Sequence, residues 1–260
     1  MSTLSSPPLP LHPPQNQVEP AAIGILGALP EEVAMLTEAM ENRSTQTYLG
    51  RQFHQGSLHG QPVVVVQGGV GKVRAATTAA LLVAHFPLRG ILFTGVAGAL
   101  AEHLQMGDVV LAHAAIEHDF GTGRAEGFVL GIDFIPELRH PLAEADSALY
   151  DLIWAQREKL LLRPFQGRDP VVHTGLVATG DVFVAHGGLR RQIQERTGAL
   201  VVEMEGAAVV RVAQEAGLPC LLVRSVSDAG DETDFLSFFQ TAALNSAAVV
   251  HRVLQSLPLP

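Results

Sequence analysis

The chain has 260 residues and a formal net charge of -9, with only 17 lysines and arginines. This acidic balance argues against a surface that follows nucleic-acid phosphates. Apolar residues make up 47% of the chain and charged residues 17%, which excludes extensive disorder and allows a sizeable core. No apolar run approaches the roughly 18–20 residues of a membrane helix. The single cysteine, Cys220, excludes an internal disulfide and suits a reducing compartment, so we expect a cytoplasmic protein. From the charge and the short apolar runs we expect no nucleic-acid partner and no membrane partner.

The beginning of the chain differs in composition from the rest. Residues 1–20 contain six prolines and neither lysine nor arginine. They lack the basic start and the unbroken apolar core of a signal peptide. We therefore expect a disordered proline-rich tail over residues 1–21 and one folded domain over residues 22–256.

From residue 22 onward, short apolar runs alternate with helical patterns. Strands are expected within 21–29, 47–60, 61–69, 89–100, 106–119, 171–180 and at both ends of 200–228; helices are expected within 30–42, 72–86, 141–161, 181–198, the middle of 200–228 and 235–254. Residues 120–141 carry glycines and no clear period, and they stay unassigned. The alternation and the near-continuous apolar strands predict an α/β fold: a single three-layer αβα domain around a mixed, largely parallel sheet.

Three carboxylates stand where predicted strands end. Glu203 and Glu205 lie at the first junction of the strand–helix–strand segment 200–228, and Asp228 follows its last apolar run. The carboxyl ends of parallel strands are where α/β proteins bind their ligands, and carboxyl groups at such a place are suited to acid–base catalysis.

Several other motifs are incomplete. The glycines of GILGAL do not have the spacing of a dinucleotide-binding fingerprint, and GGVGKV has Val73 where a phosphate loop needs Ser or Thr. The eleven histidines are scattered, and no H-E-x-x-H motif is present. His113 and His118 are five residues apart on a predicted strand and so point to opposite faces. We expect neither a metal nor an organic cofactor.

The segments GILGALPEEV, GGVGKVRAA, TGVAGAL, GDVVLA, TGDVF, VVEMEGAAVV and RSVSD follow one another in the chain. In this order they resemble the purine nucleoside phosphorylase and uridine phosphorylase superfamily, and in detail the 5'-methylthioadenosine/S-adenosylhomocysteine nucleosidases. The resemblance spans residues 23–254. It implies a fold of the nucleoside phosphorylase/hydrolase type and a homodimer. It also implies hydrolysis of the N-glycosidic bond of these adenine thionucleosides, which releases adenine in methionine and S-adenosylmethionine salvage.

The resemblance assigns the two catalytic roles to carboxyl groups. Asp228 would be the general acid that protonates adenine N7, because adenine is a poor leaving group without that proton. Glu32 would activate the attacking water. Without the resemblance, Asp228 would be interpreted as a cap or turn residue at a strand end, and Glu32 as an ordinary first-turn glutamate stabilised by the helix dipole.

The resemblance also places the substrate-binding residues. Glu205 would bind the ribose hydroxyls, with Met204 against the sugar and Arg224 near the water and Glu205. Gly98 would allow close approach of the purine. The remaining positions would form the walls, with Phe183 stacked on adenine, the Val184 backbone at the base edge, and Leu29, Val70 and Phe238 around the sugar and the 5'-alkylthio group.

Three alternatives stay open. A phosphorylase would need an anion site, yet Phe93 and Val96 stand where phosphorylases tend to carry arginine and serine, and Glu32 would repel phosphate by about 1–4 kcal/mol at surface-like dielectrics. A futalosine-type hydrolase would tend to have Asn in place of Asp228. A storage or binding relative would have no need of Glu32, Glu205 and Asp228 together. The missing serine at Val96 and the unmatched segment 120–141 leave the preference for the 5'-substituent undecided.

Overall fold

The computed structural model describes residues 21–139, 141–145, 147–229 and 232–259. The tail expected over residues 1–21 lies outside this range except for Ala21. Among the described residues, no helix is long and apolar enough to cross a membrane.

Eleven strands form the main sheet, in the order β10-β7-β11-β12-β6-β13-β5-β1-β4-β3-β2. Their bounds are β1 (Ala22–Gly27), β2 (Glu41–Tyr48), β3 (Arg51–Leu58), β4 (Gln61–Gln67), β5 (Leu88–Phe93), β6 (Val96–Ala99), β7 (Val109–Glu117), β10 (Leu142–Glu144), β11 (Val172–Thr179), β12 (Val201–Glu203) and β13 (Cys220–Asp228).

The centre of the sheet is mainly parallel and its edges are antiparallel. Strand β1 runs parallel to β4 and β5, so that Ile25 lies between Val65 and Leu92, and β13 runs parallel to β5 and β6. Strand β7 pairs in parallel with β11 and in antiparallel fashion with β13. Because β11 also pairs with β12, and β12 with β6, these five strands close into a ring.

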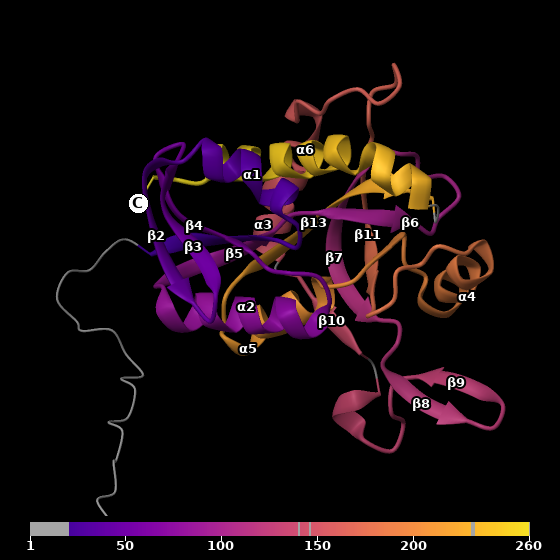
Figure 1. Ribbon diagram of the computed structural model, residues 1–260. Coiled ribbons are helices and arrows are strands. Elements are labelled where there is room, and N and C mark those ends of the chain that lie inside the picture. The colour runs from indigo at the N-terminus through magenta and orange to yellow at the C-terminus, as the bar shows by residue number, and fades with distance from the viewer. Residues whose placement is uncertain (1–20, 140, 146, 230–231, 260) are drawn as a thin grey trace, which may run out of the picture.

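Helices cover both faces of the sheet, and Figure 1 shows α1, α3 and α6 on one face and α2 and α5 on the other. Each face has its own apolar cluster, since alternate residues of a buried strand point to opposite sides. The helices are α1 (Pro30–Glu38), α2 (Lys72–His85), α3 (Ser147–Trp154), α4 (Gly187–Thr197), α5 (Gly206–Glu215) and α6 (Glu232–Ser256), with short 3-10 helices η1 (Pro136–Leu138) and η2 (Arg157–Lys159).

The predicted fold class is confirmed, and two local predictions were wrong. The helix expected over 30–42 ends at Glu38, and polar residues 41–48 form the edge strand β2 against β3. The helix expected over 141–161 begins only at Ser147, because residues 142–144 pair with β7 as β10. The unassigned segment contains the hairpin β8 (Gly121–Arg124) and β9 (Gly127–Leu130).

Candidate active site

A cavity of about 280 Å³ opens where the parallel strands of the sheet end. This is the edge at which open α/β sheets bind ligands. Its walls come from the loop after β1 and the start of α1, from the loop before α2, from β6, from the ends of β12 and β13, from the segment after β11 and from α6. The lining residues are Ala28, Leu29, Glu32, Val70, Val96, Ala97, Gly98, Val182, Phe183, Val184, Val202, Glu203, Met204, Glu205, Ser227, Asp228 and Phe235.

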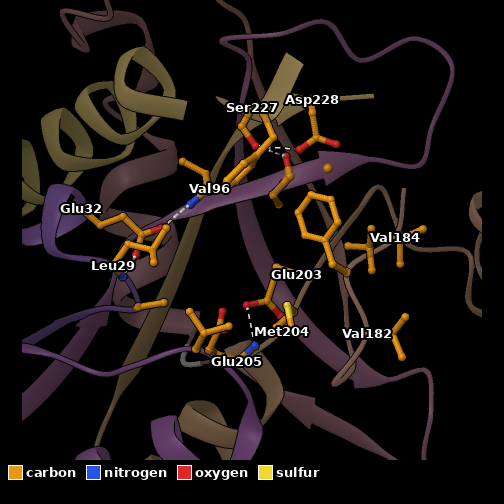
Figure 2. A pocket seen from close by; sticks show the side chains of 17 residues that line it. Leu29, Glu32, Val96, Val182, Val184, Glu203, Met204, Glu205, Ser227 and Asp228 are labelled. Carbon is orange, nitrogen blue, oxygen red and sulfur yellow. Dashed lines mark hydrogen bonds between the residues drawn. The ribbon is translucent and has the colours of Figure 1, made fainter. Parts of the chain in front are cut away.

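Glu32 is held by two backbone amides at one side of this cavity (Figure 2). The Leu29 N–H donates to its Oε2 at 2.9 Å, and the Val96 N–H donates to its Oε1 at 3.1 Å. Pro30 fits the first helical position, where no N–H is needed, and so places Glu32 in the first turn of α1. Burial raises the pKa of Glu32, although the charge of Arg224 and these amides oppose the shift. The carboxylate is thus fixed in place and more basic than an exposed one.

Glu203, at the cavity wall, forms a buried ion pair with Arg224. The Arg224 Nη2 and Nε atoms donate to Glu203 Oε2 at 2.6 and 3.2 Å. The Gly206 N–H at the start of α5 also donates to Oε2, at 2.7 Å. The guanidinium carbon of Arg224 lies 4.1 Å from the centre of the Phe93 ring, so the apolar residue at position 93 stacks on this cation. Arg224 is 1% exposed and is outside the cavity lining, which makes it a buried counter-ion for the site.

Glu205 lies at the junction of β12 and α5 and accepts a hydrogen bond from the Gly71 N–H at 2.8 Å. Burial and the nearby charge of Glu203 raise its pKa to about 8, against the opposing charge of Arg224. Burial is the largest cause, and the balance of charges adds to it, since Glu32, Glu203 and Glu205 share one guanidinium. A group that enters near Glu205 and donates hydrogen bonds or brings positive charge would therefore be stabilised.

This charge balance predicts how stability depends on pH. Because the folded pKa of Glu205 lies above its unfolded value, its contribution to folding is full below about 4.5 and is lost as pH rises through about 8. Glu205→Gln keeps an oxygen for the Gly71 N–H and cannot ionise. We expect the melting temperature of the variant, relative to that of wild type, to rise between pH 5 and pH 9. The corresponding change in the relative free energy of unfolding is on the order of 3 kcal/mol.

Thermal denaturation of the ligand-free protein across this range checks the expectation. Glu215→Gln, at an exposed glutamate in the last turn of α5, is the matched control and should follow wild type at every pH. A difference in melting temperature between Glu205→Gln and wild type that stays constant from pH 5 to pH 9 would contradict the raised pKa of Glu205.

Asp228 ends β13 on another side of the cavity from Glu32 (Figure 2). Its side chain is buried, and the Ser227 hydroxyl donates to its Oδ2 at 2.9 Å. A Cβ atom added to Gly98 would lie 3.0 Å from Asp228 Oδ1. The glycine thus leaves space for a ligand directly beside the carboxyl group.

Apolar side chains form most of the remaining wall. Of the residues predicted to bind substrate, Leu29, Val70, Gly98, Phe183, Val184, Met204 and Glu205 line the cavity. Phe183 is 43% exposed and meets the Phe235 ring edge-on at 5.4 Å. An exposed ring at a cavity mouth is suited to stacking on a planar heterocycle.

Phe238 and Arg224, although predicted for the site, do not line the cavity. The Phe238 ring packs edge-on against Phe165 at 4.9 Å, and Phe235, one turn earlier in α6, takes the lining position. Sequence reasoning missed Phe235 as well as Val182 and Ser227, and it gave Glu203 only a supporting role. For Ser227, a signal was available in its place beside Asp228 in RSVSD.

The arrangement suits replacement of a leaving group by water. A carboxyl group at Asp228 can donate a proton, a basic carboxylate at Glu32 can accept one, and Glu205 lines the same cavity as a further carboxyl group. Within the described ranges, no group of three or more His, Cys, Asp or Glu side chains is placed to hold a metal ion.

Comparison with known proteins agrees with this geometry. The profile of the phosphorylase superfamily matches residues 22–255. The chain belongs to this superfamily. Its members share the fold while differing in reaction, so the finer assignment depends on the site and on individual relatives.

The similar proteins of this superfamily include nucleosidases. A 5'-methylthioadenosine/S-adenosylhomocysteine nucleosidase of Mycobacterium tuberculosis is 32% identical over 251 residues, which cover 90% of this chain and 97% of that relative. The structure of such a nucleosidase from Neisseria meningitidis, in complex with methylthio-immucillin-A, superposes with a TM-score of 0.80 at 30% identity and covers 91% of this chain and 99% of that chain. The futalosine hydrolase of Helicobacter pylori also matches, with a TM-score of 0.80, 30% identity, and 91% and 98% coverage.

Proposed function

We propose that the protein hydrolyses the N-glycosidic bond of 5'-methylthioadenosine and S-adenosylhomocysteine, releasing adenine and the thioribose product. One observation carries the proposal: Glu32 and Asp228 lie on different sides of one cavity that also contains Glu205. Asp228 protonates adenine N7 as the bond breaks, and Glu32 takes a proton from the attacking water. Glu205 holds the ribose hydroxyls, a contact that strengthens as the sugar becomes positively charged.

Water is favoured over phosphate as the nucleophile by the surroundings of Glu32. The Val96 N–H, which could bind an anion, already donates to Glu32 Oε1. The cation nearest to this carboxylate, Arg224, is engaged by Glu203 and stacked on Phe93. No arginine or lysine is among the described residues that line the cavity, so phosphate would meet the Glu32 carboxylate without a cation beside it.

The wider setting follows from the same family. The proposed enzyme is a cytoplasmic homodimer of methionine and S-adenosylmethionine salvage that needs no metal or organic cofactor. Residues 22–256 form its catalytic domain, and residues 1–21 are a proline-rich tail that catalysis does not need. The match of relatives over 90% of the chain supports this division.

Futalosine hydrolysis is a second candidate, because the Helicobacter pylori futalosine hydrolase matches as well as the nucleosidase of Neisseria meningitidis. The apolar wall of Leu29, Val70 and Phe235 suits the thioether that both thionucleosides carry at the sugar 5' position. Asp228 also favours the thionucleosides, because a futalosine-type hydrolase would tend to have Asn at this position.

A substrate panel in phosphate-free buffer tests the proposal. We expect free adenine from both thionucleosides, a lower kcat/KM with adenosine, and little or no reaction with inosine or futalosine, as measured by chromatography. Adding phosphate should leave the rate unchanged and yield no ribose-1-phosphate product. Strict phosphate dependence would identify a phosphorylase, preference for futalosine would select the second candidate, and no base release from any nucleoside would leave the storage alternative.

A further inference from the structure

Lys72 lies outside the cavity lining but next to a residue that touches the site. It is the first residue of α2 and directly follows Gly71. Its Nζ atom lies 2.6 Å from Asp119 Oδ1 and 3.0 Å from Glu117 Oε2, both at the end of β7. The Lys72 side chain is 18% exposed, so this contact is largely screened from water. The proposed roles of the site residues do not include this charged cluster.

The cluster extends through backbone amides to a third segment. The Asp181 N–H donates to Asp119 Oδ2 at 2.8 Å, and the Lys72 N–H donates to Asp181 Oδ1 at 2.8 Å. Lys72, Asp119 and Asp181 thus contact one another in a closed ring. The ring joins the start of α2, the end of β7 and the segment after β11.

Two of these three segments form walls of the cavity. On the first, the Gly71 N–H donates to Glu205 Oε1 at 2.8 Å. On the second, Asp181 is followed directly by the lining residues 182–184. A Cβ atom added to Gly71 would lie 3.0 Å from Asp181 Oδ1. The backbone φ of Gly71 is 93°, a value that residues other than glycine rarely adopt. The chain is therefore held close to Asp181 at the point where it also meets Glu205.

The charges of the cluster support one another. Burial alone would lower the pKa of Lys72, yet the hydrogen bonds to Asp119 and Glu117 raise it. Burial alone would raise the pKa of Asp119, yet the hydrogen bonds from Lys72 and from the Asp181 N–H lower it. Lys72 and Asp119 are both charged at neutral pH. Without the ammonium, the start of α2 would lose its ion pairs with Glu117 and Asp119 at the end of β7.

We propose that Lys72 is a positioning residue for the ribose end of the site: its ion pairs with Glu117 and Asp119 hold the Gly71 N–H on Glu205. This inference rests on the proposed function, in which Glu205 binds the ribose hydroxyls. Lys72 touches no reacting atom. Lys72 acts by fixing the Glu205 carboxylate, which contacts the ribose in the proposed function. The alignment of this carboxylate matters most when charge develops on the sugar.

The test compares Lys72→Met with Lys159→Met. The chain contains only these two lysines, and Lys159 is an exposed residue of η2 far along the chain, so it is the matched control. Steady-state rates are measured with 5'-methylthioadenosine and with its 2'-deoxy and 3'-deoxy analogues. We expect Lys72→Met to lower kcat/KM for the parent nucleoside by about 10- to 100-fold, and to affect the deoxy analogue that lacks the Glu205 contact far less.

Further variants separate this role from simple stabilisation. Lys72→Arg retains the cation and should restore part of the loss, and Glu117→Gln, which keeps the Asp119 contacts, should show a smaller loss with the same dependence on the ribose hydroxyls. If Lys72→Met fails to fold, Glu117→Gln carries the comparison. An equal loss for parent and deoxy substrates, or wild-type rates for both variants, overturns the inference.

The outcome is also distinguishable from failure of the proposed function. If wild type releases no adenine from any of these nucleosides, the proposed function fails, and the link is then measured without substrate. Melting temperatures of Lys72→Met, Glu205→Gln and the double variant form a cycle. Non-additive shifts support the link between Lys72 and Glu205, and additive shifts overturn it.

Discussion

Asp228→Asn is expected to lower kcat for 5'-methylthioadenosine by about 10²- to 10⁴-fold, the range that general acid catalysis contributes. The change replaces the carboxyl group by a near isostere. The Asn oxygen can still accept the hydrogen bond that the Ser227 hydroxyl donates to Asp228 Oδ2 at 2.9 Å. The amide cannot transfer a proton to adenine N7, so adenine would have to leave as an anion. We therefore expect a melting temperature close to that of wild type together with a large loss of turnover.

The leaving group provides the sharpest control for this variant. A 5'-methylthio ribosyl substrate with p-nitrophenol in place of adenine departs as a stable anion and needs no proton. Asp228→Asn should hydrolyse it at close to the wild-type rate while remaining slow with the adenine nucleoside. Ser227→Ala should lower the rate of adenine release less than Asp228→Asn does. Wild-type release of adenine by Asp228→Asn would remove this residue from the role of general acid.

The fold could be predicted from the sequence where burial sets the pattern. The strand at 61–67 contains the run VVVV and the strand at 220–228 begins with CLLV, and such apolar runs are typical of strands covered on both faces. Strand β2 could not be predicted in this way, because seven of its eight residues are exposed and none alternates with a buried one. Its pairing with β3, rather than its own composition, makes it a strand.

The sequence predicts which residues belong to the candidate site better than it predicts which of them contact one another. E-M-E and R-S-V-S-D mark carboxylates near strand ends, and Glu205 and Asp228 do line the cavity. The sequence has no signal for which carboxylate Arg224 pairs with, and the structure shows that it is Glu203. The chain turns from β12 into α5 between Glu203 and Glu205, so that one residue binds the cation and the other meets Gly71, 134 residues away.

The rotation of a helix is a second quantity that the sequence leaves open. Phe235 and Phe238 both lie on α6, three residues apart, and either could face the cavity. The helix begins at Glu232 and packs so that Phe235 lines the site while Phe238 packs on Phe165. The packing of α6 across β13 and α1 decides between the two rings, and that packing depends on long-range contacts.

The buried ion pair has a consequence for the charges of the whole site. Arg224 balances only one of three carboxylates, and Glu203 takes its closest contacts. Glu32 and Glu205 are left with raised pKa values, for which burial is the main cause. A substrate whose sugar gains positive charge in the transition state relieves this imbalance, whereas a neutral ground state does not. The site therefore stabilises the transition state more than the substrate.

Glu32→Gln is the second variant with a large expected effect, again about 10²- to 10⁴-fold in kcat. Its carboxylate accepts hydrogen bonds from two backbone amides, Leu29 N–H and Val96 N–H. Glutamine has one oxygen for these two donors, so its amide group faces an N–H and costs about 1–3 kcal/mol in unfolding free energy. More importantly, the amide cannot accept a proton from water, and the nucleophile is no longer activated.

The pH profile separates these two effects. Because burial raises the pKa of Glu32, wild-type kcat/KM should rise with pH along a limb that lies above the ordinary glutamate value of 4.5. This limb appears because Glu32 is active as the ionised base. Glutamine at position 32 does not ionise, so the residual activity of Glu32→Gln should lack the limb. Affinity for adenine, measured by calorimetry, should match wild type, since the proposed base site is at Asp228 and Phe183, away from Glu32. An unchanged limb in the variant would assign it to another group and remove Glu32 as the base that makes water the nucleophile.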